Sequence, residues 1–170
     1  MANKGSKKFP KKSIKKELTE PSIRANHKEI KILSLVSPEL SAHSTVNKLS
    51  PYVALKYFKS DWQCFSEWDS QELKAFSTFI SSFQSYTWEQ VYRTGSKIPK
   101  HGLAYTKYVI GDIKSTAIRK KLEAVESEIS EDINFFELRV NQNKLRVHGF
   151  QSQSVFFLVV LDKNHEAFPV

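Results

Sequence analysis

The clearest pattern of apolar and polar positions lies in the last third of the chain, from Phe135 to Phe168. Between Lys144 and Phe150 the two classes alternate, as in a strand with one buried and one polar face. The next run, Val155 to Leu161, is apolar throughout, which is typical of a strand covered on both faces. Together with a strand before the turn at 141–143, the pattern predicts three antiparallel strands joined by tight turns.

Upstream of these strands the apolar spacing changes to that of helices. Asp69 is a capping signal, and it precedes an apolar stripe at spacings of three and four residues, formed by Leu73, Phe76, Ile80 and Phe83. A second, short helix is predicted over 88–92, capped by Thr87, and a third over 113–129. Tyr52 to Phe58 is rich in aromatic and aliphatic residues and predicts a strand, whereas 95–111 is predicted as a loop.

The predicted order of elements makes the chain an α+β protein: an N-terminal strand, then helices, then a three-stranded antiparallel C-terminal sheet. This single domain is expected to span residues 51–170, after a disordered basic tail (1–28) and a poorly defined extension (29–50). The net charge is +8, but residues 1–31 alone hold ten Lys or Arg and three Glu, so the remainder is close to neutral. The basicity therefore belongs to the tail, which is either solubilising or attracted to nucleic acid or the ribosome.

Several classes of protein are excluded by composition. Cys64 is the only cysteine, so an intramolecular disulfide and a thiolate metal site are both excluded, and a reducing, cytoplasmic location is expected. No apolar segment follows the basic start, and no apolar run has the length of a membrane span. The five glycines are scattered, and no His or Cys spacing fits a zinc site. We therefore predict no membrane association, no metal and no cofactor.

The candidate chemistry lies on the polar side of the alternating strand. There Arg146 and His148 share one predicted sheet face, opposite the helices, and His165 follows the last strand. Histidine suits proton transfer near neutral pH, and arginine suits the negative charge that develops on a phosphate. The combination predicts RNA cleavage, with His165 as acid or base, Arg146 as phosphate clamp and His148 beside them. The candidate nucleic-acid-binding lysines are Lys144, Lys107, Lys100 and Lys163.

Each of these residues also has an ordinary structural interpretation. His148 can be an exposed strand residue without a function, and His165 can simply belong to the exit from the last strand. Arg146 can be a cross-strand partner of Glu137 or Asp162. The lysines can be part of a solvated loop or surface.

The order of elements also resembles that of a known family. Leu145-Arg146-Val147-His148-Gly149-Phe150, followed by the run from Val155 to His165, resembles the RelE/ParE-like family of small toxins. Members have one N-terminal strand, a helical pair and an antiparallel C-terminal sheet, and the ribonuclease members cut mRNA at the ribosomal decoding site. The resemblance implies that Arg146 holds the scissile phosphate and that His165 stands where many members place a His or Tyr. The segment 95–130 is longer than the family's usual connection.

We therefore expect a toxin-like, metal-independent endoribonuclease that cleaves mRNA at the ribosome and is controlled by a protein antitoxin. The branch of the family that acts on DNA gyrase shares the topology. The alternative hypothesis is a non-catalytic nucleic-acid- or protein-binding accessory module of a mobile element or phage. In that case either the sheet or the basic tail is the functional part.

Overall fold

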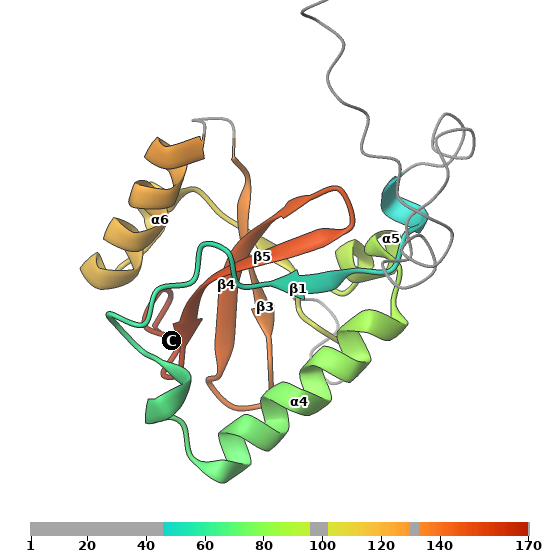
Figure 1. The fold of residues 1–170 in the computed structure, drawn as a ribbon, viewed down its shortest axis with the longest axis horizontal. Helices are drawn as coiled ribbons and strands as arrows, with labels where there is room; N and C mark the ends of the chain where they lie inside the picture. Colours follow the sequence, from blue (N-terminus) through green and yellow to red (C-terminus); the bar gives the residue numbers. More distant parts are fainter. Residues whose placement is uncertain (1–45, 96–101, 130–132, 170) are drawn as a thin grey trace, which may run out of the picture. The chain divides into compact units, whose positions relative to one another are not determined.

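The computed structural model describes residues 46–95, 102–129 and 133–169, which lie within the second of the chain's two units, Pro38–Val170. Their centre is a five-stranded mixed sheet with the order β1-β5-β4-β3-β2 (Figure 1). The strands are Tyr52–Ala54 (β1), Thr106–Lys107 (β2), Phe135–Arg139 (β3), Arg146–Ser152 (β4) and Val155–Asp162 (β5). β1 runs parallel to β5, and the other neighbouring strands are antiparallel.

The α+β class agrees with the prediction, but the prediction of a three-stranded C-terminal sheet is wrong. β3, β4 and β5 do pair antiparallel as expected, and they form the middle of a larger sheet. β1 adds to the edge beside β5, and β2 adds beside β3. The segment 95–111 was predicted as a loop because the two residues of β2 are too few to show alternation.

The first two helices of the described residues begin at the predicted capping positions, and the third begins at Thr116, three residues after its predicted start. They are Ser70–Ser85 (α4), Trp88–Arg93 (α5) and Thr116–Ile129 (α6), with 3-10 turns at Val46–Lys48 (η1), Phe65–Glu67 (η2) and Ile110–Asp112 (η3). The Asp69 carboxylate accepts hydrogen bonds from the backbone N–H of Gln71 and Glu72 at the start of α4. Glu72 in turn accepts from the Asp69 N–H, which completes a capping box. Thr87 caps α5 as predicted.

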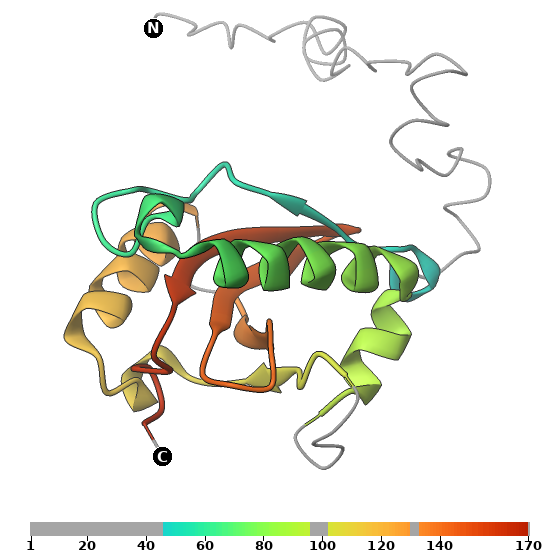
Figure 2. The ribbon, with the colours of Figure 1, turned by 90° about the horizontal axis from the view of Figure 1, so that it is seen from below.

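Helices cover both faces of the sheet, and each face has its own core. On one face, termed the α4 face, α4 and α5 pack Phe83 and Trp88 against Phe136 and Phe156. On the other, termed the α6 face, the core contains Ile118, Leu122 and Val125 of α6 with Phe135, Phe150, Val159 and Val160 of the sheet. In Figure 2, α4 runs along the sheet and α6 lies to its left. The expectation of an open polar face is therefore wrong, because α6 covers the apolar part of this face and Tyr108 lies against His148.

A bulge in β5 changes the register in the middle of the sheet. The pairing of β4 with β5 shifts between His148 and Gly149, so that Val159 and Val160 both join the α6-face core. At this point the two strands approach so closely that a Cβ on Gly149 would lie 2.1 Å from the carbonyl oxygen of Phe157. Only glycine fits this position without movement of the backbone.

Two further predictions concern the parts outside the domain. The predicted basic tail (1–28) and residues 29–45 of the predicted extension lie outside the described residues. Among the described residues, no helix combines the length and the apolar character needed to cross a lipid bilayer. The cytoplasmic location stays a prediction.

Candidate functional site

A group of polar side chains interrupts the apolar α6 face at one end of the sheet. Cross-strand pairing places Glu137 of β3 opposite His148 of β4, and Arg146 of β4 between Arg139 and Asp162. Residues of one strand that alternate in this way share one face. With His165 from the turn after β5, they form what is termed here the polar cluster: Glu137, Arg139, Arg146, His148, Asp162 and His165. The next row of this face is aromatic, so the cluster lies directly beside the core.

The carboxylate of Glu137 and the imidazole of His165 face each other within the cluster. Glu137 Oε2 and His165 Nε2 lie 3.3 Å apart, and the two side chains are only 10% and 15% exposed. The two groups are not aligned for a hydrogen bond, and neither of these two atoms has a hydrogen-bond partner among the described residues. Buried polar atoms without a partner are rare, and functional sites are one of the places where they occur. This pair is therefore the strongest candidate for proton transfer.

His165 also has an unusual backbone conformation. Its φ is +57°, in the left-handed region that non-glycine residues rarely adopt. The Cβ of an L-residue clashes with the following carbonyl there, which costs roughly 1–2 kcal/mol. Strained residues persist only where the surrounding structure determines them, and they cluster at functional sites.

Arg146 lies on the predicted face, but its hydrogen bonds go to the β3–β4 turn. Its Nη1 donates to the carbonyl oxygens of Asn143 at 2.8 Å and of Leu145 at 3.0 Å. As the structural interpretation expected, Asp162 is the cross-strand neighbour of Arg146, but no salt bridge joins Arg146 to Glu137 or Asp162 among the described residues. Burial lowers the pKa of the guanidinium, while the negative charge of Glu137 raises it. Arginine remains a cation at neutral pH, so the cluster contains a half-buried positive charge next to the Glu137–His165 pair.

His148 is fully buried, which contradicts its predicted place on an exposed face. Its Nδ1 lies 3.0 Å from the Tyr108 hydroxyl, and its Nε2 lies 3.3 Å from Asp162 Oδ2. The alternation correctly places His148 on the same face as Arg146, but the sequence of a strand does not show which other residues cover that face. In this conformation RNA cannot reach the His148 imidazole.

The two groups that flank His148 have shifted pKa values. Burial raises the pKa of the Tyr108 hydroxyl well above 10, and the charges of Glu137 and Asp162 raise it further. Burial alone would raise the pKa of Asp162 as well, but hydrogen bonds from His148 and from the backbone N–H of Ala167 lower it. Tyr108 is therefore a hydroxyl donor and Asp162 a carboxylate acceptor. Because the Asp162 carboxylate can only accept, Nε2 of His148 is the donor in that contact, and Nδ1 faces the Tyr108 hydroxyl.

The structure brings two of the four predicted lysines together. Lys144 is exposed in the β3–β4 turn, and Lys163 follows β5. Both line a cleft of about 420 Å³ at the start of α4, which is also lined by the carboxylates of Asp69 and Glu72. The Lys163 ammonium lies 2.9 Å from a carboxylate oxygen of Glu72, and this hydrogen bond raises its pKa. Lys144 is therefore the freer of the two for a phosphate.

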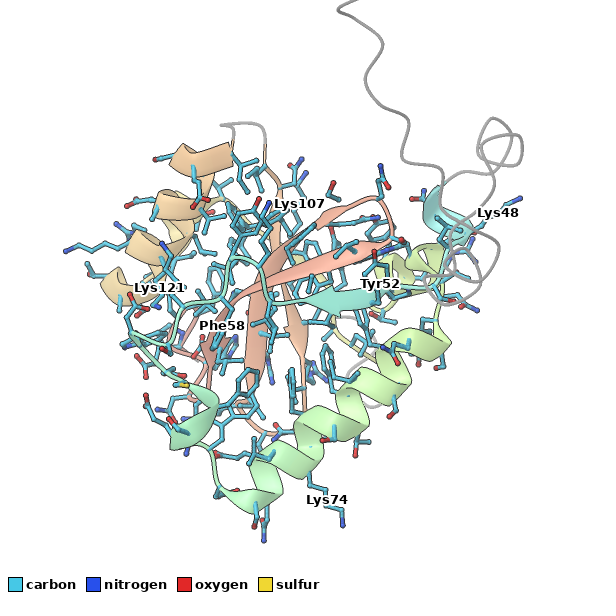
Figure 3. All side chains as sticks on the ribbon, in the orientation of Figure 1. Lys48, Tyr52, Phe58, Lys74, Lys107 and Lys121 are labelled. Atoms are coloured by element: carbon cyan, nitrogen blue, oxygen red, sulfur yellow. The ribbon has the colours of Figure 1, made fainter. Side chains whose placement is uncertain are left out.

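The other two predicted lysines are separate from this cleft. Lys107 pairs with Phe136 in register and lines a second cleft with Tyr105 and Tyr92. Figure 3 shows Lys107 far from Lys74 and from the first turn of α4. Lys100 lies outside the described residues.

Sequence reasoning missed three members of the polar cluster, Glu137, Arg139 and Asp162, and it also missed Tyr108, which contacts His148. Glu137 and Asp162 enter the sequence analysis only as possible cross-strand partners of Arg146. One signal was available, since a carboxylate inside the run Phe135 to Leu138 breaks an otherwise apolar strand. A charged group in a buried strand needs a partner or a function. No comparable signal exists for Tyr108, because its contact with His148 is made by tertiary packing.

Comparison of the chain with protein-family models, with curated proteins and with solved structures finds no match in any of the three. The resemblance to RelE/ParE-like toxins therefore stays a prediction. Within the ranges that the structure describes, no group of three or more His, Cys, Asp or Glu side chains is placed to hold a metal ion.

Proposed function

We propose that the chain is a toxin-like, metal-independent endoribonuclease that cleaves mRNA, with Glu137, Arg146 and His165 as catalytic residues. The observation that carries the proposal is the 3.3 Å approach of Glu137 Oε2 to His165 Nε2, where neither atom forms a hydrogen bond with another described residue. The half-buried cation of Arg146 lies on the same sheet face. RNA cleavage without a metal needs a base, an acid and a cation, and a carboxylate, an imidazole and a guanidinium can supply these three functions.

RNA supplies its own nucleophile, the 2′-hydroxyl next to each phosphodiester. A base takes the proton of this hydroxyl while the bond from the 2′-oxygen to phosphorus forms. An acid gives a proton to the 5′-oxygen while the bond from phosphorus to that oxygen breaks. The products are a 2′,3′-cyclic phosphate and a 5′-hydroxyl, and no further reactant is consumed.

Each of the three side chains has a role in these steps. Glu137 accepts the proton of the 2′-hydroxyl, His165 donates to the 5′-oxygen, and Arg146 donates hydrogen bonds to the phosphate oxygens as negative charge develops. RNA binding separates Glu137 from His165, and each atom then finds its missing partner in the substrate. Because Glu137 Oε2 and His165 Nε2 are both buried, the two side chains must move apart before a phosphate can reach them.

The proposal extends to the partners of the protein. The charge of the first 31 residues attracts RNA through the release of counterions, which favours encounter with the ribosome. A protein antitoxin that covers the polar cluster would keep the enzyme inactive. Removal of residues 1–28 should weaken ribosome association at low salt. Unchanged association would contradict the role of the tail without affecting the catalytic proposal.

The first test uses the purified full chain, a short single-stranded RNA and a metal chelator. We expect the wild type to leave 2′,3′-cyclic phosphate ends, and Glu137→Gln, Arg146→Ala and His165→Ala each to lower the rate at least about 100-fold. Glu123→Gln, at an exposed position on α6, is the matched control and should keep the wild-type rate. Induced expression in a bacterium should arrest growth and create new mRNA 5′ ends that the variants lose. A wild type without cleavage would refute the proposal.

The second candidate function is a non-catalytic RNA- or protein-binding module. It is favoured by the low exposure of Glu137 and His165, together with the exposed Lys144 beside a cleft. This function predicts RNA binding without cleavage, and binding that is unchanged in His165→Ala. The cleavage assay therefore separates the two candidates.

A further inference from the structure

The turn that carries His165 closes around a single buried carboxylate. Asp162, the last residue of β5, accepts hydrogen bonds from the N–H of Glu166 at 2.7 Å and of Ala167 at 2.9 Å. Both donors follow His165, whereas the acceptor precedes it. The backbone on the two sides of His165 is thus tied to one side chain, which holds φ of His165 at +57°.

The orientation of that carboxylate is fixed from the sheet. Asp162 has no exposed surface, and its Oδ2 lies 3.3 Å from Nε2 of His148, which is also fully buried. The other imidazole nitrogen lies 3.0 Å from the hydroxyl of Tyr108. A continuous series of contacts therefore runs from Tyr108 through His148 and Asp162 to the backbone of Ala167.

We infer that Asp162 and His148 are positioning residues, which aim the His165 imidazole at Glu137 by holding this turn in its strained conformation. Neither side chain can touch RNA, because both are inaccessible to solvent. Without the two acceptors of Asp162, residue 165 is free to return to a negative φ, and its side chain then leaves the vicinity of Glu137. The inference rests on the proposed function, since the aim of the imidazole matters only if His165 transfers a proton.

A second anchor makes the effect local. The carbonyl oxygen of Ala167 accepts a hydrogen bond from the N–H of Lys114 at 2.9 Å, and Ala167 is itself fully buried. The end of the turn therefore stays attached to the segment before α6 when the Asp162 contacts are weakened. We expect Asp162→Asn to fold, with the disturbance concentrated between residues 163 and 167.

The test compares steady-state cleavage of a short RNA by the full chain and its variants. Asp162→Asn has one acceptor oxygen in place of two, so either Glu166 or Ala167 loses its partner. We expect kcat to fall about 100-fold, the effect of a misplaced reacting group, while KM stays within about twofold. His148→Gln keeps a donor toward Asp162 and should retain more activity than His148→Ala. Val125→Ala, which leaves a cavity under α6, controls for general destabilisation.

The outcomes separate positioning from chemistry. Loss of kcat in Val125→Ala equal to that in Asp162→Asn, or equal activity of His148→Gln and His148→Ala, would overturn the inference. Amide hydrogen exchange at Glu166 and Ala167 provides a readout that needs no cleavage. If the wild type proves inactive on RNA, the proposed function fails. Faster exchange at these two amides in Asp162→Asn would still support control of the turn, and unchanged exchange would overturn it.

Discussion

The Glu137 carboxylate and the His165 imidazole approach to 3.3 Å although β4 separates their strands in the sheet. Strand pairing alone cannot produce this contact, because Glu137 belongs to β3 and His165 follows β5. The turn after β5 bends back across the α6 face and brings the imidazole over the sheet. The site therefore depends on the conformation of one short turn as much as on the strands.

The first prediction concerns this pair as a unit. Glu137→Gln and His165→Gln should each lower the rate of RNA cleavage by about 10² to 10⁴, since each removes one proton-transfer group. The double variant should be nearly as active as the slower single variant, because residues that act together lose their function together. Initial rates of the wild type, the two single variants and the double variant on one RNA complete a double-mutant cycle. Losses that multiply fully in the double variant would show that the two side chains act independently.

The second prediction distinguishes two lysines that line one cleft. Lys144→Gln should weaken RNA binding and reduce the salt dependence of log Kd by about one phosphate contact, because Lys144 is exposed. Lys163→Gln should change the salt dependence less, because Glu72 already pairs with that ammonium. Titration of a catalytically inactive His165→Ala background at several salt concentrations measures both slopes. Equal slopes for the two variants would contradict this division of roles.

The third prediction tests the close approach of β4 and β5. Gly149→Ala would place its Cβ 2.1 Å from the carbonyl oxygen of Phe157 and 2.8 Å from the ring of Phe156, so the strands must separate. We expect a loss of about 3 kcal/mol or more in the free energy of unfolding, or failure to fold. Gly111→Ala meets no atom within 4 Å and should stay within about 0.5 kcal/mol of the wild type. Urea unfolding measures both, and similar values for the two variants would refute the argument.

Much of the fold follows from local pattern, and the site does not. The helix from Ser70 to Ser85 was predictable because its cap and apolar spacing are local in sequence. The strands β3 to β5 were predictable for the same reason. β2 was not, since two residues carry no pattern, and its place depends on β3 as a template. The burial of the α6 face was not predicted. Alternation along a strand shows which residues share a face, but it does not show whether other elements cover that face.

The candidate site shows the same division. Arg146 and His165 were identified from the sequence, and the structure places both in the polar cluster. His148 was assigned to the right face but the wrong environment, because its burial depends on Tyr108 and Asp162. The approach of Glu137 to His165 joins positions that no periodicity connects. Distances between side chains on different elements are set by tertiary packing, so only the structure could supply them.

The fourth prediction is a dependence of stability on pH that originates at Asp162. Burial acts to raise the pKa of this carboxyl, but the hydrogen bonds from His148 and from the backbone N–H of Ala167 and Glu166 prevail and lower it. A carboxyl whose pKa is lower in the folded than in the unfolded state stabilises the fold at pH values above its pKa in the unfolded state, which is about 4. This contribution disappears as the pH falls through the folded value.

The free energy of unfolding should therefore fall on acidification below about pH 4, and the fall should be shallower in Asp162→Asn, which cannot titrate there. The two curves should differ most near neutral pH and converge in acid. Urea unfolding at several pH values between 7 and 3 measures them, with Asp112→Asn as the control at an exposed position. Parallel curves for the wild type and Asp162→Asn would mean that the carboxylate contributes no pH-dependent stability. The hydrogen bonds to the turn would then be too weak to hold His165 in its strained conformation.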